Sequence, residues 1–247
     1  MERCATVSIQ RFNLTLNRQA AKLLFLNIIV EKNLLTFGQR FFVIIFAGVF
    51  MMIRKMTKKE LRQQMKQLKG MTPEAVKHVE ADMVFNMIEK MPAWMQAQHI
   101  LCYWSLPDEL PTHEMVQRWL EAGKNIYLPR VVGDDLEIVP YHGAQSLDDN
   151  NKFHIGEPVG DAVDPSCLEL IIVPAVALDA KRNRLGRGKG FYDRLLSTIS
   201  CPTIGVVCDF QLVDEVPVEP HDRPLDCVVT SDGVIADSVK QNLFMSY

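Results

Sequence analysis

The chain has 247 residues, of which 48% are hydrophobic and 23% are charged, and these proportions are ordinary for a globular protein with one sizeable core. The net charge of −3 and the sequence pI of about 6.1 exclude the basic footprint of a non-specific nucleic-acid binder. The six cysteines form no Cys-x-x-Cys pair and no zinc spacing, so we expect a reduced, cytoplasmic protein without a disulfide framework.

Residues 1–50 differ from the rest of the chain and show no sustained hydrophobic period. The uncharged run Phe41–Ile53 is shorter than the roughly 18–20 residues that span a bilayer, and no small-residue cleavage site follows it. Three interpretations stay open: a start codon assigned too early, an amphiphilic extension, or a membrane anchor. The first is favoured. We therefore expect residues 1–50 to lie outside the core, one domain over residues 52–247, and no membrane partner.

A capping box, Thr57-x-x-Glu60, predicts the start of the first helix of that domain. Lys58 and Arg62 follow four residues apart, so their side chains share one helix face. Two neighbouring cations are usually only a solvated surface. A second helix is predicted over residues 72–90, with Val79 and Met83 among its inward side chains.

A strand, a loop, a helix and another strand come next, in the order of a βαβ unit. We assign them to residues 99–104, 105–111, 112–123 and 125–128. Right-handed crossover places the loop, which holds Asp108 and Glu109, at the carboxyl edge of the sheet, where open α/β folds bind ligands. Further strands are predicted at residues 136–141, 168–173, 202–208 and 225–230. This alternation predicts an α/β fold with a mostly parallel central sheet.

Between the predicted strands 168–173 and 202–208 lies a stretch rich in glycine and in cations, Asn183–Arg194. Gly186, Gly188 and Gly190 can adopt positive φ and let backbone N–H groups converge on an anion at the start of a helix. Arginine and lysine residues add full positive charges. The stretch is neither a Walker A loop nor a dinucleotide fingerprint, because the spacing of both motifs fails. It predicts a polyphosphate site, with a solvated turn as the alternative.

The stretch Asn183–Arg194 closely resembles the signature of the 5-formyltetrahydrofolate cyclo-ligase family, Arg-Leu-Gly-x-Gly-x-Gly-Tyr-Tyr-Asp. Phe191 replaces the first tyrosine of that signature, and Arg182 stands where the family often has glycine. The resemblance implies a Rossmann-like three-layer α/β/α fold and a monomer. It also implies the conversion of ATP and 5-formyltetrahydrofolate into 5,10-methenyltetrahydrofolate, ADP and phosphate, with Mg²⁺ as the metal.

The resemblance also implies roles for particular residues. Lys189, Arg187 and Tyr192 are the expected catalytic residues, and Trp104, Glu109 and Tyr192 are expected to bind the folate. Asp193 and Asp226 are expected to share Mg²⁺. The expected ATP-binding residues are Lys58, Arg62, Arg184, Leu185, Gly186, Arg187, Gly188, Lys189, Gly190, Phe191 and Tyr192.

Several of these residues have a plainer interpretation. Trp104 fits equally well as a core aromatic at a strand end, Asp193 as an acid that favours the helix dipole, and Asp226 as a solvated strand-end acid. Two other functions also stay open. A sugar-phosphate isomerase on the same fold would need a base carboxylate but no ATP-binding helix, so Lys58 and Arg62 oppose it. A folate- or nucleotide-binding relative without turnover is the second alternative.

Overall fold

Two helices open the part of the chain that the computed structural model describes, which is residues 56–148, 156–220 and 222–245. Helix α3 spans Lys58–Met71, and its predicted capping box is confirmed: the Glu60 amide donates to Thr57 Oγ1 over 3.2 Å, and the Thr57 amide donates to Glu60 Oε2 over 2.8 Å. The predictions for residues 1–50 lie outside the described residues. Every described helix is too short or too polar to cross a membrane.

Helix α4 spans Glu74–Ile88, and the prediction of its inward face is partly wrong. Val79 is 59% exposed and Met83 is 47% exposed, whereas Phe85 and Ile88 are buried. Apolar residues at helical spacing occur on two sides of this helix, so the sequence alone permits either side to face inward. The side that carries the bulky Phe85 and Ile88 packs against the sheet, because it buries more apolar surface.

The central sheet has seven strands in the order β12-β11-β9-β6-β1-β2-β3. Strands β11, β9, β6, β1 and β2 are mutually parallel, and the edge strands β12 and β3 are antiparallel to their neighbours. The bounds are β1 His99–Leu101, β2 Asn125–Val132, β3 Asp135–Pro140, β6 Leu170–Pro174, β9 Thr203–Val206, β11 Cys227–Thr230 and β12 Gly233–Ala236. The predicted α/β class with a mostly parallel sheet is therefore confirmed.

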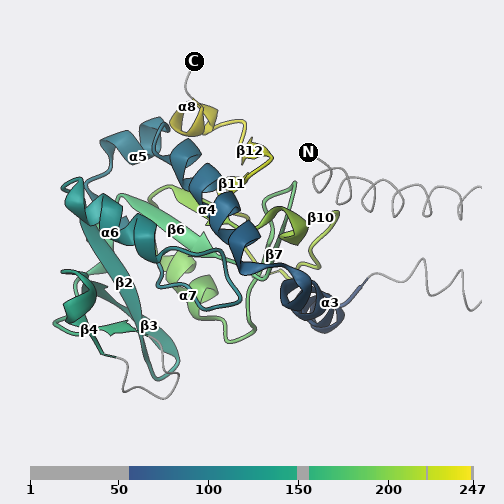
Figure 1. Cartoon of the computed structure of the whole chain (residues 1–247), viewed down its shortest axis with the longest axis horizontal. Coiled ribbons are helices and arrows are strands. Elements are labelled where there is room, and N and C mark those ends of the chain that lie inside the picture. The colour runs from purple at the N-terminus through teal and green to yellow at the C-terminus, as the bar shows by residue number, and fades with distance from the viewer. Residues whose placement is uncertain (1–55, 149–155, 221, 246–247) are drawn as a thin grey trace, which may run out of the picture. The chain divides into compact units, whose positions relative to one another are not determined.

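Helices cover both faces of this sheet, as Figure 1 shows. On one face lie α4, α5 (Pro92–Gln96), α6 (His113–Glu121) and α8 (Gln241–Phe244), and on the other lies α7 (Phe191–Thr198). Neighbouring strand residues alternate between the two cores: Ile100 and Ile172 face the first group of helices, while Leu101 and Ile171 face α7. The arrangement has three layers, α/β/α, as the resemblance implied.

The sequence analysis did not predict the small second sheet, β10-β7-β8, whose strands β7 and β8 follow β6 and whose strand β10 follows β9. Its strands are β7 Ala177–Asp179, β8 Arg184–Leu185 and β10 Leu212–Val213. Strands of two or three residues are too short to show a period in the sequence. Leu61 and Met65 of α3 pack against Leu185 in a separate core cluster, which fixes α3 beside the glycine-rich stretch.

The remaining short elements lie outside these layers. They are the two-stranded sheet of β4 (Leu147–Asp148) and β5 (Glu157–Pro158) and three 3₁₀ turns at Ala144–Ser146, Pro165–Cys167 and Asp209–Gln211. By its internal contacts the chain divides into Met1–Met56 and Thr57–Tyr247, and all the elements named above belong to the second unit.

Candidate active site

A cavity of about 200 Å³ opens at the carboxyl ends of β1 and β6. The segment after β1 forms one wall with Trp104 and Glu109, and the glycine-rich stretch forms the opposite wall with Lys189, Tyr192 and Asp193. This is the edge of the sheet at which the sequence predicted a site. Residues expected to bind ATP and residues expected to bind folate thus line one cavity.

The glycine-rich stretch links β8 to α7 and has the predicted strand–turn–helix form. Gly188 has φ +97° and Gly190 has φ +72°, and Gly190 is the N-cap of α7. Arg62 reaches this turn from α3: its Nε donates to the Gly186 carbonyl oxygen over 2.8 Å. A Cβ on Gly188 would lie 3.3 Å from the guanidinium carbon of Arg62, so glycine permits this close approach.

The cations of this stretch have different surroundings. Lys189 is exposed and, within the described parts of the chain, its ammonium makes no ion pair. Arg184 is buried, pairs with Asp193 and lies over the Tyr192 ring at 5.6 Å. The side chain of Arg187 extends away from the turn, and its guanidinium donates to the carboxylates of Asp108 and Glu109 on the opposite wall. Lys189 is therefore the cation of the turn that is most accessible to an incoming anion.

Lys58 lies one helical turn before Arg62 on α3, and its ammonium is neutralised by two carboxylates. Its Nζ lies 2.6 Å from Asp222 and 2.7 Å from Glu219. Burial alone would lower the pKa of Lys58, but these two carboxylates outweigh it and raise the pKa. The sequence analysis did not single out Asp222, because only the fold brings residues 58 and 222 together.

The wall of the cavity that was expected to bind folate is built from Trp104 and Glu109. The Trp104 ring stacks on His113 with centroids 3.9 Å apart and lies 5.7 Å from Tyr141. Both oxygens of Glu109 accept hydrogen bonds: Oε2 from the Leu106 amide over 3.0 Å, and Oε1 from Arg187 over 3.0 and 3.1 Å. The Glu109 carboxylate is thus held in a fixed orientation toward the cavity.

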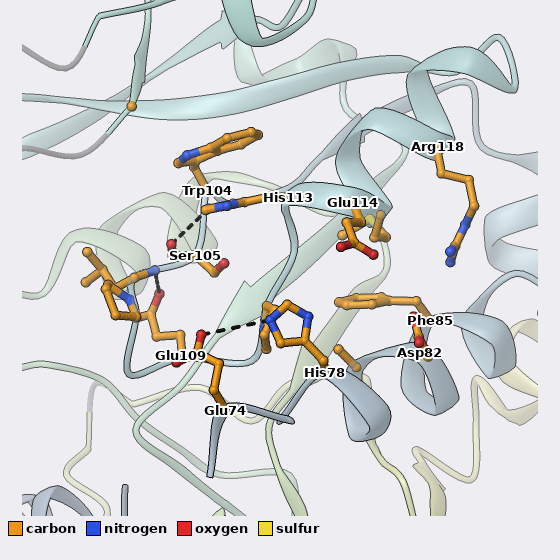
Figure 2. A pocket seen from close by; sticks show the side chains of 16 residues that line it. Glu74, His78, Asp82, Phe85, Trp104, Ser105, Glu109, His113, Glu114 and Arg118 are labelled. Carbon is orange, nitrogen blue, oxygen red and sulfur yellow. Dashed lines mark hydrogen bonds and ion pairs between the residues drawn. The ribbon is translucent and has the colours of Figure 1, made fainter. Parts of the chain in front are cut away.

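A second cavity, of about 500 Å³, lies on the far side of the same segment, between α4 and α6 (Figure 2). The two cavities share Trp104, Leu106, Glu109 and Gly156. Figure 2 shows His113 beside Trp104, and its Nε2 lies 3.0 Å from the Ser105 carbonyl oxygen. His113 was absent from the expected site residues, since a lone histidine at a helix start carries no distinguishing signal in the sequence.

Tyr192 lines the first cavity, and its hydroxyl is one of two buried polar atoms that lack a hydrogen-bond partner among the described residues. Burial, followed by the charge of Glu109, raises the pKa of Tyr192 far above its usual range. A buried hydroxyl without a partner is costly, and a ligand that brought an acceptor would relieve that cost. The neighbouring Phe191 also lines the cavity, and Arg194 lies over its ring at 5.6 Å.

The expectation that Asp193 and Asp226 share a metal is wrong in geometry. Asp193 lies in the first turn of α7, whereas Asp226 directly precedes β11 at the amino edge of the sheet. The Asp226 carboxylate accepts from the Thr203 amide over 3.0 Å and pairs with Lys240 at 2.8 Å. One strand length, roughly 15 Å, separates the two edges of the sheet. Because Asp226 lies at the start of the predicted strand 225–230, a parallel sheet places it at the amino edge, and the resemblance alone suggested otherwise.

The described part of the chain contains no group of three or more His, Cys, Asp or Glu side chains that could hold a metal ion by itself. Leu185 is buried in the α3 cluster, so it supports the turn with its side chain and offers only backbone groups to a nucleotide. These placements define an α/β fold with one cavity, in which a basic glycine turn faces an acidic and aromatic wall.

Comparison with known proteins identifies the family. Residues 54–231 match the model of the 5-formyltetrahydrofolate cyclo-ligase family, and the chain belongs to that family. It is 34% identical over 175 residues to the 5-formyltetrahydrofolate cyclo-ligase of Escherichia coli (strain K12), with 67% of this chain and 95% of that protein covered. It is 30% identical to a probable 5-formyltetrahydrofolate cyclo-ligase of Schizosaccharomyces pombe, covering 62% and 84%.

The solved structures agree with this assignment. The chain resembles the structure of Aquifex aeolicus 5,10-methenyltetrahydrofolate synthetase with a TM-score of 0.67 and 30% identity, covering 73% of this chain and 93% of that one. A synthetase from Mycoplasma pneumoniae matches with a TM-score of 0.58 at 21% identity, which supports the fold. The expected family and the expected three-layer fold are both confirmed.

Proposed function

We propose that the cavity at the carboxyl ends of β1 and β6 performs the reaction of the family. The chain is a 5-formyltetrahydrofolate cyclo-ligase, an ATP-dependent ligase of folate one-carbon metabolism. In that reaction ATP and 5-formyltetrahydrofolate yield 5,10-methenyltetrahydrofolate, ADP and phosphate. The observation that carries the placement is the single cavity in which the basic glycine turn faces Trp104 and Glu109.

The glycine turn supplies the nucleotide side of the site. Arg62 and Lys189 are suited to the triphosphate, because Arg62 lies over Gly188 and Lys189 projects from the turn without an ion pair in the described structure. Backbone N–H groups at the start of α7 add the positive end of the helix dipole. Lys58 lies one helical turn before Arg62 on α3, and Arg184 supports the turn through its ion pair with Asp193.

The opposite wall supplies the folate side. Trp104 offers an aromatic face and Glu109 a fixed carboxylate, which suit a flat heterocycle that carries N–H donors. The buried Tyr192 hydroxyl can donate to an oxygen or nitrogen of the bound folate. We infer that the formyl group lies between the folate wall and the phosphate turn.

The chemical step that this arrangement supports is phosphorylation of the formyl oxygen. An amide-like formyl oxygen is a poor leaving group, and transfer of the γ-phosphoryl group to it gives an iminium phosphate and ADP. N10 then attacks the activated carbon and loses its proton to solvent, the C–O bond breaks, and phosphate departs. The chain needs no covalent nucleophile for this sequence, since its residues position both substrates and neutralise charge, as in phosphoryl transfer generally.

Mg²⁺ would neutralise phosphate charge in this site. It prefers a few carboxylates, waters and phosphate oxygens to a complete protein cage, and the described residues offer carboxylates without a closed cluster. Asp193 begins the helix after the glycine turn, and Asp222 pairs with Lys58 one helical turn from Arg62. We assign the protein's share of the metal site to Asp193 and Asp222, in place of Asp226.

A turnover assay tests the proposed function. Purified protein, MgATP and 5-formyltetrahydrofolate should give the absorbance of 5,10-methenyltetrahydrofolate, with one ADP and one phosphate released for each product molecule. Tight binding of both substrates without product would instead support the non-catalytic relative.

A pair of aspartate variants tests the metal assignment. Asp222→Asn should raise the Mg²⁺ concentration needed for half-maximal turnover, whereas Asp226→Asn should leave that concentration unchanged because Asp226 lies at the other edge of the sheet. The reverse pattern would restore Asp226 to the site and remove Asp222 from it.

We also propose that the protein acts as a monomer in a reducing compartment. Every side chain assigned above comes from one chain, and the five cysteines in the described regions are free thiols. Light scattering of the active protein gives the oligomeric state directly, and a dimer whose dissociation abolishes turnover would contradict the proposal.

A further inference from the structure

Arg187 forms a bridge between the two walls of the cavity. Its Nη2 lies 2.5 Å from Asp108 and 3.0 Å from Glu109, and its Nε lies 3.1 Å from Glu109. An arginine of the phosphate turn is therefore bound to the carboxylates of the folate wall. The two sites share one cation.

Asp108 is held from two directions. Besides Arg187, it pairs with Lys69 of α3 at 3.2 Å, and the Lys69 side chain is only 6% exposed. The neighbouring Pro107 carbonyl oxygen accepts from Lys77 of α4 over 2.5 Å. Burial alone would raise the pKa of Asp108, but Arg187 and Lys69 outweigh it and lower the pKa. Asp108 is thus a charged and fixed anchor for Arg187.

This arrangement sets up a competition within the active site. Glu109 Oε1 already accepts two hydrogen bonds from Arg187, so a folate N–H that donates to this oxygen must displace Arg187. A phosphate group that attracts Arg187 must likewise pull it from Asp108 and Glu109. The first ligand to bind meets the free-energy cost of separating Arg187 from the carboxylates, and the second ligand then binds without that cost. Each ligand therefore raises the affinity of the protein for the other.

We propose that Asp108 is a positioning residue that holds Arg187 on the folate wall and thereby couples nucleotide binding to folate binding. The inference rests on the proposed function, since it takes Arg187 as a phosphate contact and Glu109 as a folate contact. Asp108 itself touches neither substrate. It sets how readily Arg187 is released, and hence how strongly one substrate favours the other.

Binding of a non-hydrolysable ATP analogue with Mg²⁺, measured by calorimetry with and without 5-formyltetrahydrofolate, tests this coupling. The wild type should bind the analogue more tightly when folate is present. Asp108→Asn should bind the analogue alone about two- to five-fold more tightly, as expected for loss of a half-exposed ion pair. The enhancement by folate should shrink by the same factor, because the bridge is already weakened.

Two further variants separate this role from a general structural or electrostatic effect. Lys69→Met removes the second cation from Asp108, so the ion pair between Asp108 and Arg187 becomes stronger. The enhancement of nucleotide binding by folate should therefore grow, whereas Asp108→Asn should reduce it. Glu137→Gln is the matched control, because it breaks an ion pair of similar exposure with Arg130 at 2.6 Å on another part of the sheet. That control should leave nucleotide affinity and folate enhancement unchanged.

The outcomes of these measurements are distinct. Unchanged or weaker analogue binding by Asp108→Asn, alongside normal wild-type turnover, overturns the coupling role and leaves the proposed function intact. Should that variant not fold, a folate enhancement in Lys69→Met that equals or falls below the wild-type value overturns the role equally. Absence of methenyl product from the wild type overturns the proposed function, and the inference falls with it.

Discussion

Replacing Lys189 by alanine should weaken nucleotide binding and leave the fold intact. Lys189 is exposed on the phosphate turn and has no ion pair among the described residues, so its removal leaves no buried charge behind. A charge-assisted contact to phosphate contributes about 1.5–3 kcal/mol. That loss corresponds to a rise of roughly 10- to 100-fold in the KM for ATP. The KM for 5-formyltetrahydrofolate should change much less.

Arg184→Ala is the informative comparison, because Arg184 belongs to the same turn and has the opposite surroundings. Its side chain is 6% exposed and pairs with Asp193, which is 36% exposed. Breaking such a pair should cost about 2–4 kcal/mol of unfolding free energy, discounted for the solvent that reaches Asp193. Any weakening of ATP binding then follows from a distorted turn.

Two assays on both variants decide the matter: denaturant unfolding for stability, and initial rates of methenyl product formation at varied ATP concentration for binding. The reasoning is refuted if Lys189→Ala lowers the unfolding midpoint as much as Arg184→Ala does. A KM for ATP within two-fold of the wild-type value in Lys189→Ala would refute it equally.

Three further predictions concern backbone strain, pH and the folate wall. Arg182 has φ +67° and binds Asp237, so Arg182→Gly should be about 1 kcal/mol more stable than Arg182→Ala in denaturant unfolding. Burial lowers the pKa of His113, so on acidification the unfolded chain takes up a proton at a higher pH than the folded chain does. The free energy of unfolding should therefore fall as the pH drops below about 6.5, and it should fall less in His113→Gln. Glu109→Gln should keep ATP binding in calorimetry and lose folate turnover, and unchanged folate kinetics would exclude Glu109 from the site.

Patterns among residues close together in the sequence predicted much of the fold. The apolar run that became β6, the capping box of α3 and the glycine before α7 each depend on residues close together in the chain. The predicted strand ends differ from the observed ones by up to four residues. β1 and β9 were predicted too long, because apolar residues continue beyond the last ladder hydrogen bond, whereas β2 was predicted four residues too short. The strands β7 and β8 escaped prediction, since so few residues carry no period.

Arg182 shows how a departure from the family pattern is accommodated. The turn between β7 and β8 requires positive φ at this position, which explains why glycine often stands there in the family. Arginine is strained in this conformation, and its side chain offsets the strain by donating to the Leu225 carbonyl oxygen and to Asp237. The sequence revealed the substitution, but only the fold reveals its partners, 43 and 55 residues away in the chain.

The cations of the glycine turn mark the limit of sequence reasoning about the site. Proximity in the chain predicted that they gather around an anion, and Arg184, Arg187 and Lys189 were all expected to bind ATP. The fold sorts them by their carboxylate partners: Arg184 with Asp193 inside the turn, Arg187 with Asp108 across the cavity, and Lys189 with none among the described residues. The energy of a charge depends on its nearest counter-charge and on its burial, and both are set by residues distant in the chain. A motif therefore identifies the ligand class, whereas the contacts around it decide which of its cations can bind that ligand.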